Sequence, residues 1–282
     1  MTITKNILIT GCSSGIGRGL AEGLQARGYR VFATARKAED VAMLTAQGLE
    51  SVQLDVSDSA SIQQAVQEIL MRTEGRIYAL INNAGYGQPG AVEDLRREVL
   101  REQFETNLFG ALELTNLVLP GMRAQGQGRI INISSLLGLV VLPFRGAYNA
   151  SKFALEGLTD TFRLELRGSG IFVSLIEPGP IRSNFRPNSF LAYQKNINPE
   201  RSVHRDKYRA MERRLTRSGA AMPFTLTPEA VLKKVIHALE NRRPKPRYYV
   251  TIPTYVAAIL KRLLPHRALD WIAHKLGGNG AT

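Results

Sequence analysis

The sequence predicts an α/β fold, a doubly wound parallel sheet of about seven strands with helices on both faces. Short runs rich in Ile, Val and Leu alternate along the chain with longer helix-like stretches. This alternation is typical of repeated βαβ units, because parallel strands are buried on both faces and form near-continuous apolar runs. Every gap between two runs is long enough for a helix, so one sheet can hold all of them.

Seven segments are expected to form the strands of this sheet. They are Asn6–Thr10, Arg30–Ala35, Ser51–Leu54, Tyr78–Asn82, Gly128–Ser134, Ile171–Glu177 and Arg247–Thr251. The chain has 282 residues, of which 44% are hydrophobic, and this suffices for one large core. We therefore expect one domain over residues 1–252, followed by a basic amphipathic C-terminal extension over residues 253–282.

One connection, residues 184–226, is too long for a plain crossover. It follows the sixth strand and ends where Thr227 and Pro228 form the signature of a helix start, with an N-cap and a proline in the first turn. Long insertions at the carboxyl edge of such a sheet are usually lids or binding loops. We expect residues 184–226 to form a helical lid over a substrate pocket.

Charge and composition limit the partners and the compartment. Residues 1–180 carry 17 Lys+Arg and 18 Asp+Glu, whereas residues 181–282 carry 20 and 6, so the basic excess lies in the last third. These cations are scattered and accompany no recognised module, so we expect no nucleic-acid partner. A lone Cys12 excludes an internal disulfide, and the four histidines share no metal-ligand spacing, so we expect no metal. The chain shows neither an export signal nor a spanning apolar run, which favours the cytoplasm.

A glycine-rich turn follows the first expected strand. It reads Thr10-Gly-Cys-Ser-Ser-Gly-Ile-Gly17 and precedes a helix-forming stretch, residues 18–27. Glycines in such a turn let the backbone approach a pyrophosphate, whose charge is stabilised by the free N–H groups at the helix start. An ordinary strand-to-helix turn is the alternative, but this placement is the one that a dinucleotide site requires. The expected cofactor contacts here are Gly11, Ser13, Ser14, Gly15, Ile16 and Gly17.

The end of the second strand indicates which dinucleotide is preferred. Sites for NAD commonly carry a carboxylate there, bonded to the adenosine ribose. Residues 31–37 contain no carboxylate, and Arg36 stands where a guanidinium could pair with a 2′-phosphate. A solvated arginine at a helix start is the alternative interpretation. We therefore expect NADP, with NAD as the less favoured cofactor.

Tyr148 and Lys152 are four residues apart in a helix-prone stretch and should share one helix face. A tyrosine with a pKa of about 10 is a poor acid or base at neutral pH, and a nearby ammonium favours its phenolate form. Ser135 lies 13 residues before Tyr148 at the end of the fifth expected strand. Carboxyl ends of strands are where ligands bind in these folds, so the three residues are candidates for one site.

Over residues 5 to about 250 the chain resembles the short-chain dehydrogenase/reductase family. The matching pieces occur in the family's order: Thr10-Gly-x-x-x-Gly-Ile-Gly17, Asp55-Val56, Asn82-Asn-Ala-Gly85, Asn107, Ser135, Tyr148-x-x-x-Lys152 and Pro178-Gly-Pro-Ile181. The resemblance implies an oxidoreductase with a Rossmann-type fold, in which hydride transfer belongs to the nicotinamide cofactor.

The resemblance also implies a role for each matching residue. Ser135 would steady the substrate oxygen and Tyr148 would exchange the proton. Lys152 would hold the nicotinamide ribose and lower the tyrosine pKa, and Asn107 would join a water-linked proton relay to Lys152. The remaining implied cofactor contacts are Asp55, Val56, Asn82, Ala84, Gly85, Pro178, Gly179, Ile181 and Ser183, the last being a serine where the family commonly has threonine.

Several features resemble a bacterial subgroup of NADP-dependent aldehyde reductases, and some are shared with retinol and hydroxysteroid dehydrogenases. The expected activity is therefore interconversion of an apolar aldehyde or ketone and its alcohol. Phe144 and Phe185 are candidate substrate contacts, although the aromatic residues of the insertion could equally serve only to pack the lid. A nonenzymatic regulator that senses a dinucleotide is the rival hypothesis, but it has no use for an acid/base tyrosine.

The C-terminal extension carries an apolar stripe beside basic residues. Val256, Ile259, Leu260, Leu263 and Leu264 recur at helical spacing. Over residues 255–276, such a segment can lie on the inner membrane surface, or cover the body or a neighbouring subunit. The family resemblance suggests a homodimer or homotetramer.

Overall fold

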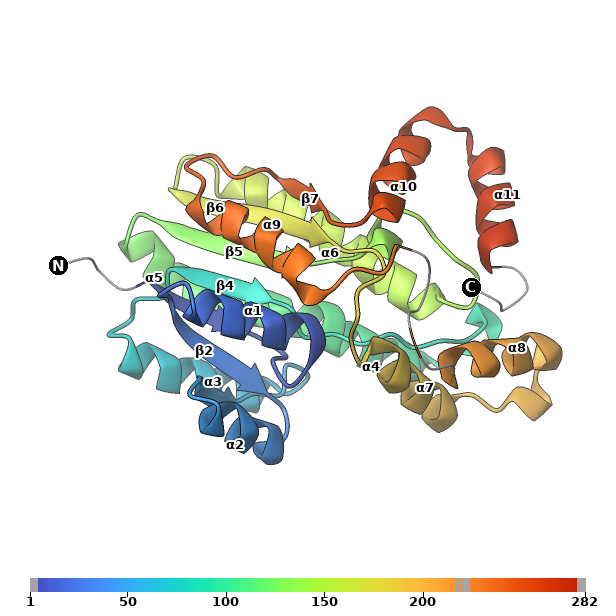
Figure 1. The fold of residues 1–282 in the computed structure, drawn as a ribbon, viewed down its shortest axis with the longest axis horizontal. Helices are drawn as coiled ribbons and strands as arrows, with labels where there is room; N and C mark the ends of the chain where they lie inside the picture. The colour runs from blue at the N-terminus through green and yellow to red at the C-terminus, as the bar shows by residue number, and fades with distance from the viewer. Residues whose placement is uncertain (1–4, 217–218, 220–223, 278–282) are drawn as a thin grey trace.

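The computed structural model describes residues 5–216, 219 and 224–277. A single seven-stranded parallel sheet runs through it, with helices on both faces (Figure 1). The strands are β1 (Asn6–Ile9), β2 (Arg30–Ala35), β3 (Glu50–Gln53), β4 (Ala79–Asn82), β5 (Gly128–Ile133), β6 (Ile171–Glu177) and β7 (Arg247–Tyr249). The expected fold class is confirmed, and the seven expected strands differ from these by at most two residues at either end.

The strand order is β3-β2-β1-β4-β5-β6-β7. The chain leaves β1 toward β2 and β3, then returns to place β4 on the other side of β1. Crossover connections on either side of this reversal diverge, which opens a crevice beyond the carboxyl ends of β1 and β4. The sequence motifs after β1, β4 and β5 therefore face one region.

Alternation along the strands divides the apolar core into two layers. Ile7 and Ile9 of β1 pack on one side with α1 (Gly15–Gln25), α2 (Ala38–Ala46) and α9 (Pro228–Glu240), whereas Leu8 packs on the opposite side. That opposite side is covered by α3 (Ser59–Arg72), α5 (Gly110–Ala124) and α6 (Gly146–Glu165). Both faces of the sheet are thus sealed from water, and its carboxyl edge is left for chemistry.

The insertion after β6 contains α7 (Phe185–Asn196) and α8 (Arg205–Thr216), which lie at the carboxyl edge of the sheet (Figure 1). Their apolar residues form a separate small core with the loop after β4: Ala91, Tyr193, Ile197, Tyr208, Met211 and Leu215. Two hydrogen bonds also hold α8 against the loop after β4. The Tyr208 hydroxyl donates to Asp94 Oδ2 at 2.5 Å and accepts from the Ala91 amide at 2.9 Å. The insertion is therefore bound to the body by packing of its own.

Two helices end the described chain, α10 (Ile252–Leu263) and α11 (His266–Gly277), separated by Pro265. They project from the body at the same edge of the sheet (Figure 1). Three of the five residues of the expected apolar stripe face away from the body, since Val256, Ile259 and Leu263 are 46%, 55% and 74% exposed, whereas Leu260 and Leu264 are partly buried. No helix among the described residues is long and apolar enough to span a bilayer.

Close backbone contacts make one glycine of this fold sensitive to substitution. A Cβ at Gly110, the first residue of α5, would lie 1.9 Å from the Val56 carbonyl oxygen, so Gly110→Ala must separate α5 from the end of β3. We expect this variant to lose about 1–3 kcal/mol of unfolding free energy, as measured by urea denaturation.

The matched control is Gly157→Ala, in α6, where a Cβ meets nothing within 4 Å. Alanine there should add about 0.5–1 kcal/mol through helix propensity. Equal effects of the two substitutions would contradict the proposed close approach.

Candidate active site

The glycine-rich turn is a tight backbone contact between β1 and α1. Gly11 and Gly15 have backbone φ values of +72° and +58°, which residues other than glycine rarely adopt. A Cβ at Gly17 would lie 2.1 Å from the Gly11 carbonyl oxygen. Ser14, at the N-cap of α1, makes no capping hydrogen bond with its side chain, so the first N–H groups of the helix remain free to bind an anion.

The loop after β4 supports this turn from the side. Asn83 Nδ2 donates to the carbonyl oxygens of Thr10 and Gly11 at 2.8 and 3.1 Å, and the Thr10 hydroxyl accepts from the Asn83 and Ala84 amides at 3.0 and 2.9 Å. A Cβ at Gly11 would lie 2.9 Å from Ala84 Cα. Asn83 belongs to the motif Asn82-Asn-Ala-Gly85 but was not among the individual contacts expected from the sequence. Its place in that motif was the signal that could have identified it.

Asn82 itself points into the protein. Its Nδ2 donates to Asn132 Oδ1 at 2.9 Å and to Thr115 Oγ1 at 3.2 Å, which ties β4 to β5 and to α5. Its side chain therefore joins these elements behind the cleft, and its expected contact with a cofactor remains a prediction.

Arg36 and the Asp55-Val56 pair lie together at the ends of β2 and β3. Arg36 is exposed just beyond β2, and its carbonyl accepts from Gln53 Nε2 at 3.0 Å. Asp55 Oδ1 accepts from the Ser57 amide at 2.9 Å and from its hydroxyl at 2.7 Å, while Val56 is buried. Arg36, Asp55 and Val56 lie at the carboxyl edge of the sheet, on the side of the glycine-rich turn. The exposed guanidinium of Arg36 can bind an anion from solvent.

The loop after β6 closes on the glycine-rich turn. A Cβ at Gly15 would lie 2.8 Å from Ser183 Cβ, and one at Gly179 would lie 2.1 Å from Thr251 Oγ1. Ile181 forms an isolated bridge with Leu226, just before α9. Residues 178–183 therefore line the cleft opposite the loop after β4.

Tyr148, Ser135 and Lys152 meet at the carboxyl end of β5. Tyr148 is buried in the first turn of α6, and Ser135 lies close enough to its hydroxyl to lower the tyrosine pKa. Lys152 Nζ donates to the Ile133 carbonyl at 2.8 Å and lies 5.7 Å from the centroid of the Tyr148 ring. The helical spacing has thus placed both side chains on the buried face that looks into the cleft.

Asn107 lies in a π-helical turn, Glu105–Phe109, between α4 (Arg97–Phe104) and α5. Its amide exchanges hydrogen bonds with the Tyr86 backbone at 3.1 and 3.0 Å and donates to Ser151 Oγ at 3.1 Å. A Cβ at Gly85 would lie 3.1 Å from Asn107 Oδ1 and 3.9 Å from Lys152 Nζ, so the two side chains flank the same glycine. Departures from α-helical geometry are frequent at functional sites, where they reorient one side chain.

Sequence comparison identifies the family. The family model described as short chain dehydrogenase matches residues 5–194. The chain belongs to the short-chain dehydrogenase family. It is an oxidoreductase of that family, and the expected resemblance is confirmed.

Its relatives include the oxidoreductase YbbO of Escherichia coli, 43% identical over 268 residues that cover 95% of this chain and 93% of YbbO. Human retinol dehydrogenase 8 is 36% identical, with 88% of this chain and 82% of that protein covered.

Solved structures share the fold. A Burkholderia phymatum short-chain dehydrogenase in complex with NAD has a TM-score of 0.77 at 28% identity, covering 95% of each chain. A variant of actinorhodin polyketide ketoreductase with NADPH has a TM-score of 0.72 at 28% identity, covering 88% of this chain and 95% of that one.

Burial dominates the electrostatics of Tyr148 and Lys152. Burial raises the pKa of Tyr148 to about 12, against a smaller opposing effect of its hydrogen bond with Ser135. Burial also lowers the pKa of Lys152 to about 8, which the negative charge of Glu156 partly offsets. The lowering of the tyrosine pKa by Lys152 stays a prediction, because burial is the largest effect on each of the two groups in this structure.

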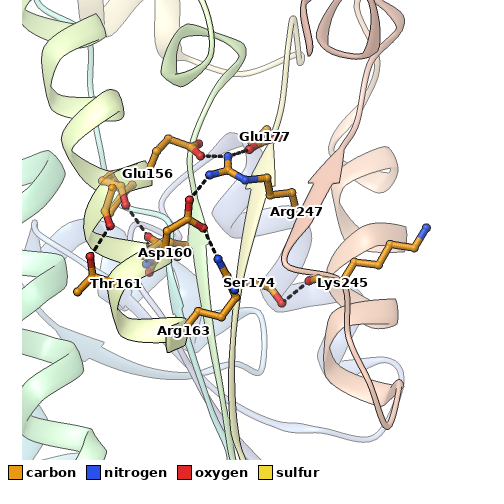
Figure 2. A network of polar contacts seen from close by, with 12 residues as sticks. Glu156, Asp160, Thr161, Arg163, Ser174, Glu177, Lys245 and Arg247 are labelled. Atoms are coloured by element: carbon orange, nitrogen blue, oxygen red, sulfur yellow. Dashed lines mark hydrogen bonds and ion pairs between the residues drawn. The ribbon is translucent and has the colours of Figure 1, made fainter. Parts of the chain in front are cut away.

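A largely buried network of charges joins α6, β6 and β7 (Figure 2). Glu156 follows Lys152 by one helical turn, and Arg247 of β7 pairs with Glu156, with Glu177 Oε1 at 2.6 Å and with Asp160 Oδ2 at 2.6 Å. Glu177 is fully buried at the end of β6. The network joins α6, β6 and β7, so it fixes the helix that carries Tyr148 against the loop that lines the cleft. Sequence reasoning missed it, although Tyr148, Lys152, Glu156 and Asp160 are spaced four apart.

The two candidate substrate residues have different surroundings. The Phe185 ring meets the Tyr148 ring edge-on, with centroids 5.2 Å apart, and therefore stands at the mouth of the site. Phe144 has a φ of +60°, and its ring packs on His204 and Tyr208 at centroid distances of 5.4 and 5.6 Å. Phe144 thus belongs to the small core that holds the insertion, which favours the packing role left open for these aromatic residues.

The buried network makes stability depend on pH in a predictable direction. Burial and the charge of Glu156 raise the pKa of Glu177 from 4.5 to about 8. Its protonation therefore favours the folded state. The stabilisation of the folded state by protonated Glu177 is fully present below the pKa of this carboxyl in the unfolded chain. It is lost as pH rises through about 8. We expect Glu177→Gln to lose less thermal stability than the unmodified protein between pH 5 and pH 9, as shown by Tm.

Glu74→Gln provides the matched control, because the Glu74 side chain is 77% exposed and should leave the pH dependence of Tm unchanged. Parallel Tm profiles for Glu177→Gln and the unmodified protein would show that Glu177 does not hold the proton.

Proposed function

We propose that this short-chain dehydrogenase is NADP(H)-dependent and interconverts an apolar aldehyde or ketone and its alcohol, with Tyr148 as the acid and base. The observation that carries the proposal is the buried Tyr148, which lies beside Ser135 and one helical turn from Lys152, whose ammonium donates to the Ile133 carbonyl. A bound nicotinamide supplies or accepts the hydride. The protein's residues must then deliver the proton and stabilise charge on the substrate oxygen.

The proton step follows from the three side chains. In the direction of reduction, Ser135 and Tyr148 both donate hydrogen bonds to the carbonyl oxygen, and Tyr148 gives up its proton as the alcohol forms. The phenolate left behind is stabilised by the positive charge of Lys152, whose ammonium is fixed by the Ile133 carbonyl. Oxidation of the alcohol reverses these steps. Asn107, which like Lys152 lies close to Gly85, would carry the replacement proton toward the ammonium through water.

The residues of the cleft fit a dinucleotide. The free N–H groups at the start of α1 suit the pyrophosphate, and the glycines at 11, 15 and 17 leave the backbone open to close approach. Ser13, Ile16, Asp55 and Val56 would flank its adenosine half, and Ala84, Gly85 and residues 178–183 its nicotinamide half. Arg36 would pair with the 2′-phosphate, which favours NADP over NAD.

An apolar substrate is supported by Phe185 beside Tyr148 and by the names of the relatives. These include human retinol dehydrogenase 8 and 17-beta-hydroxysteroid dehydrogenase type 1, which are 36% and 34% identical to this chain. We favour aldehyde reduction, with oxidation of a retinol-like or steroid-like alcohol as the second candidate because of these two relatives.

Removal of one hydroxyl tests the chemistry. We expect Tyr148→Phe to lower kcat by about 10²–10⁴-fold in an NADPH assay with a panel of aldehydes and ketones, because the proton donor is lost. Binding of NADPH, measured by its fluorescence, should change little. A variant that turns over substrate at the original rate would refute the assignment, and lack of turnover by the unmodified protein would favour a dinucleotide sensor.

Cofactor preference has its own test. Arg36→Asp should raise KM for NADPH by about 10–100-fold, since a charge-assisted hydrogen bond is worth about 1.5–3 kcal/mol. Activity with NADH should be retained or increased, because a carboxylate can bind the ribose hydroxyl. Lys37→Asp, one residue away, is the control and should alter the preference less. An unchanged ratio of kcat/KM for NADPH and NADH would contradict the role of Arg36.

A further inference from the structure

Helix α10 turns its apolar side away from the protein. Five large apolar residues fall on one face of the helix and are strongly exposed, whereas Thr254 and Ala258, on the other side, are buried and Leu260 is partly buried. An amphipathic helix that docks on its own domain shows the reverse arrangement. The exposed residues are Ile252 (59%), Tyr255 (44%), Val256 (46%), Ile259 (55%) and Leu263 (74%).

Helix α11 extends this exposed apolar area. Trp271 and Leu276 are 60% and 48% exposed, and both helices project from the body (Figure 1). We call the seven exposed apolar residues of the two helices the α10–α11 surface. Isolated exposed apolar residues are ordinary, but a group confined to two consecutive helices marks a site of interaction.

The charges around this surface favour one kind of partner. Arg262, Arg267 and Lys275 accompany the single acid Asp270 in residues 252–277, and a fourth cation, Lys261, lies over the Phe153 ring of α6. Lys275 Nζ lies 4.0 Å from the Trp271 ring centroid, which places a cation beside the most amphipathic side chain of the surface. A symmetric contact with a second copy would bring two such basic segments together in a chain whose net charge is already +13. An anionic lipid surface offers the complementary charge.

We propose that the α10–α11 surface binds the interface of an anionic lipid membrane. The exposed aliphatic residues and Trp271 would enter the boundary between headgroups and acyl chains, and the flanking cations would meet the lipid phosphates. This combination is what holds amphipathic helices in the plane of a membrane interface. The protein would lie on the bilayer and not cross it.

The start of α10 lies at the rim of the active site. The Thr251 and Thr254 hydroxyls pack against Gly179, since a Cβ there would lie 2.1 and 3.0 Å from their oxygens. Gly179 belongs to the loop that lines the cleft. A membrane bound to the α10–α11 surface would therefore stand close to the entrance used by an apolar substrate.

Trp271 makes the proposal directly measurable, because it is the only tryptophan of the chain. Intrinsic fluorescence should shift to shorter wavelength when vesicles of phosphatidylcholine with phosphatidylglycerol are added to the intact protein. Brominated acyl chains should quench it. Co-sedimentation should be stronger with these vesicles than with pure phosphatidylcholine and should weaken as salt is added.

Two variants separate the apolar and the electrostatic contributions. Ile259→Ser with Leu263→Ser should abolish the shift, and Arg262→Gln with Arg267→Gln should weaken partitioning by about 30-fold, since each cation near an anionic surface is worth about 1 kcal/mol. Met71→Ser with Lys233→Gln is the matched control, because Met71 is 69% exposed and both residues lie outside α10 and α11. Activity toward a water-soluble aldehyde should be equal in all of them.

Three outcomes would overturn the proposal. The first is absence of both the fluorescence shift and co-sedimentation with anionic vesicles. The second is equal partitioning of the paired serine variant and the unmodified protein. The third is a concentration-dependent blue shift without vesicles that accompanies dimerisation in analytical ultracentrifugation, because a second copy would then cover the α10–α11 surface. None of these outcomes bears on the roles of Tyr148 and Lys152.

Discussion

A buried ammonium requires compensating negative charge, and this constraint organises the carboxyl edge of the sheet. Lys152 is removed from water together with Tyr148, and Glu156 lies one turn farther along the same helix. A carboxylate in that position would itself be costly, so Arg247 pairs with it and with Glu177. Because one of these two carboxyl groups retains a proton, the network can remain close to neutral inside the protein.

This arrangement links the site to the outermost strand of the sheet. Arg247 belongs to β7, Glu177 ends β6, and Glu156 and Asp160 lie on α6. The loop that lines the cleft begins directly after Glu177, and α10 begins directly after β7. The same group of contacts therefore sets the positions of α6, of the loop after β6 and of the C-terminal helices. Breaking a buried pair leaves an uncompensated charge, so these positions are not easily changed independently.

The sequence is sufficient for the fold and for the members of the site. Seven apolar runs predict the seven strands, and the glycine turn, Ser135 and the Tyr148–Lys152 spacing each predict a local geometry that the structure contains. Prediction is less successful where a side chain could have two surroundings. Phe144 lies in the small core of the insertion, and Asn82 joins two strands and a helix. The polar network also escapes prediction, since its members are separated by up to 91 residues.

Two things thus follow from the sequence alone. The first is which elements form, since periodicity and turn residues act locally, and the second is which residues are candidates for the chemistry, since their types and spacing are specific. Tertiary structure decided how burial shifts the pKa values of Tyr148 and Lys152, because the cost of burial depends on everything packed around a group. It also decided which way the apolar stripe of α10 faces. Periodicity shows that a helix has an apolar side, but only the contacts of Thr254 and Ala258 with the body determine where that side points.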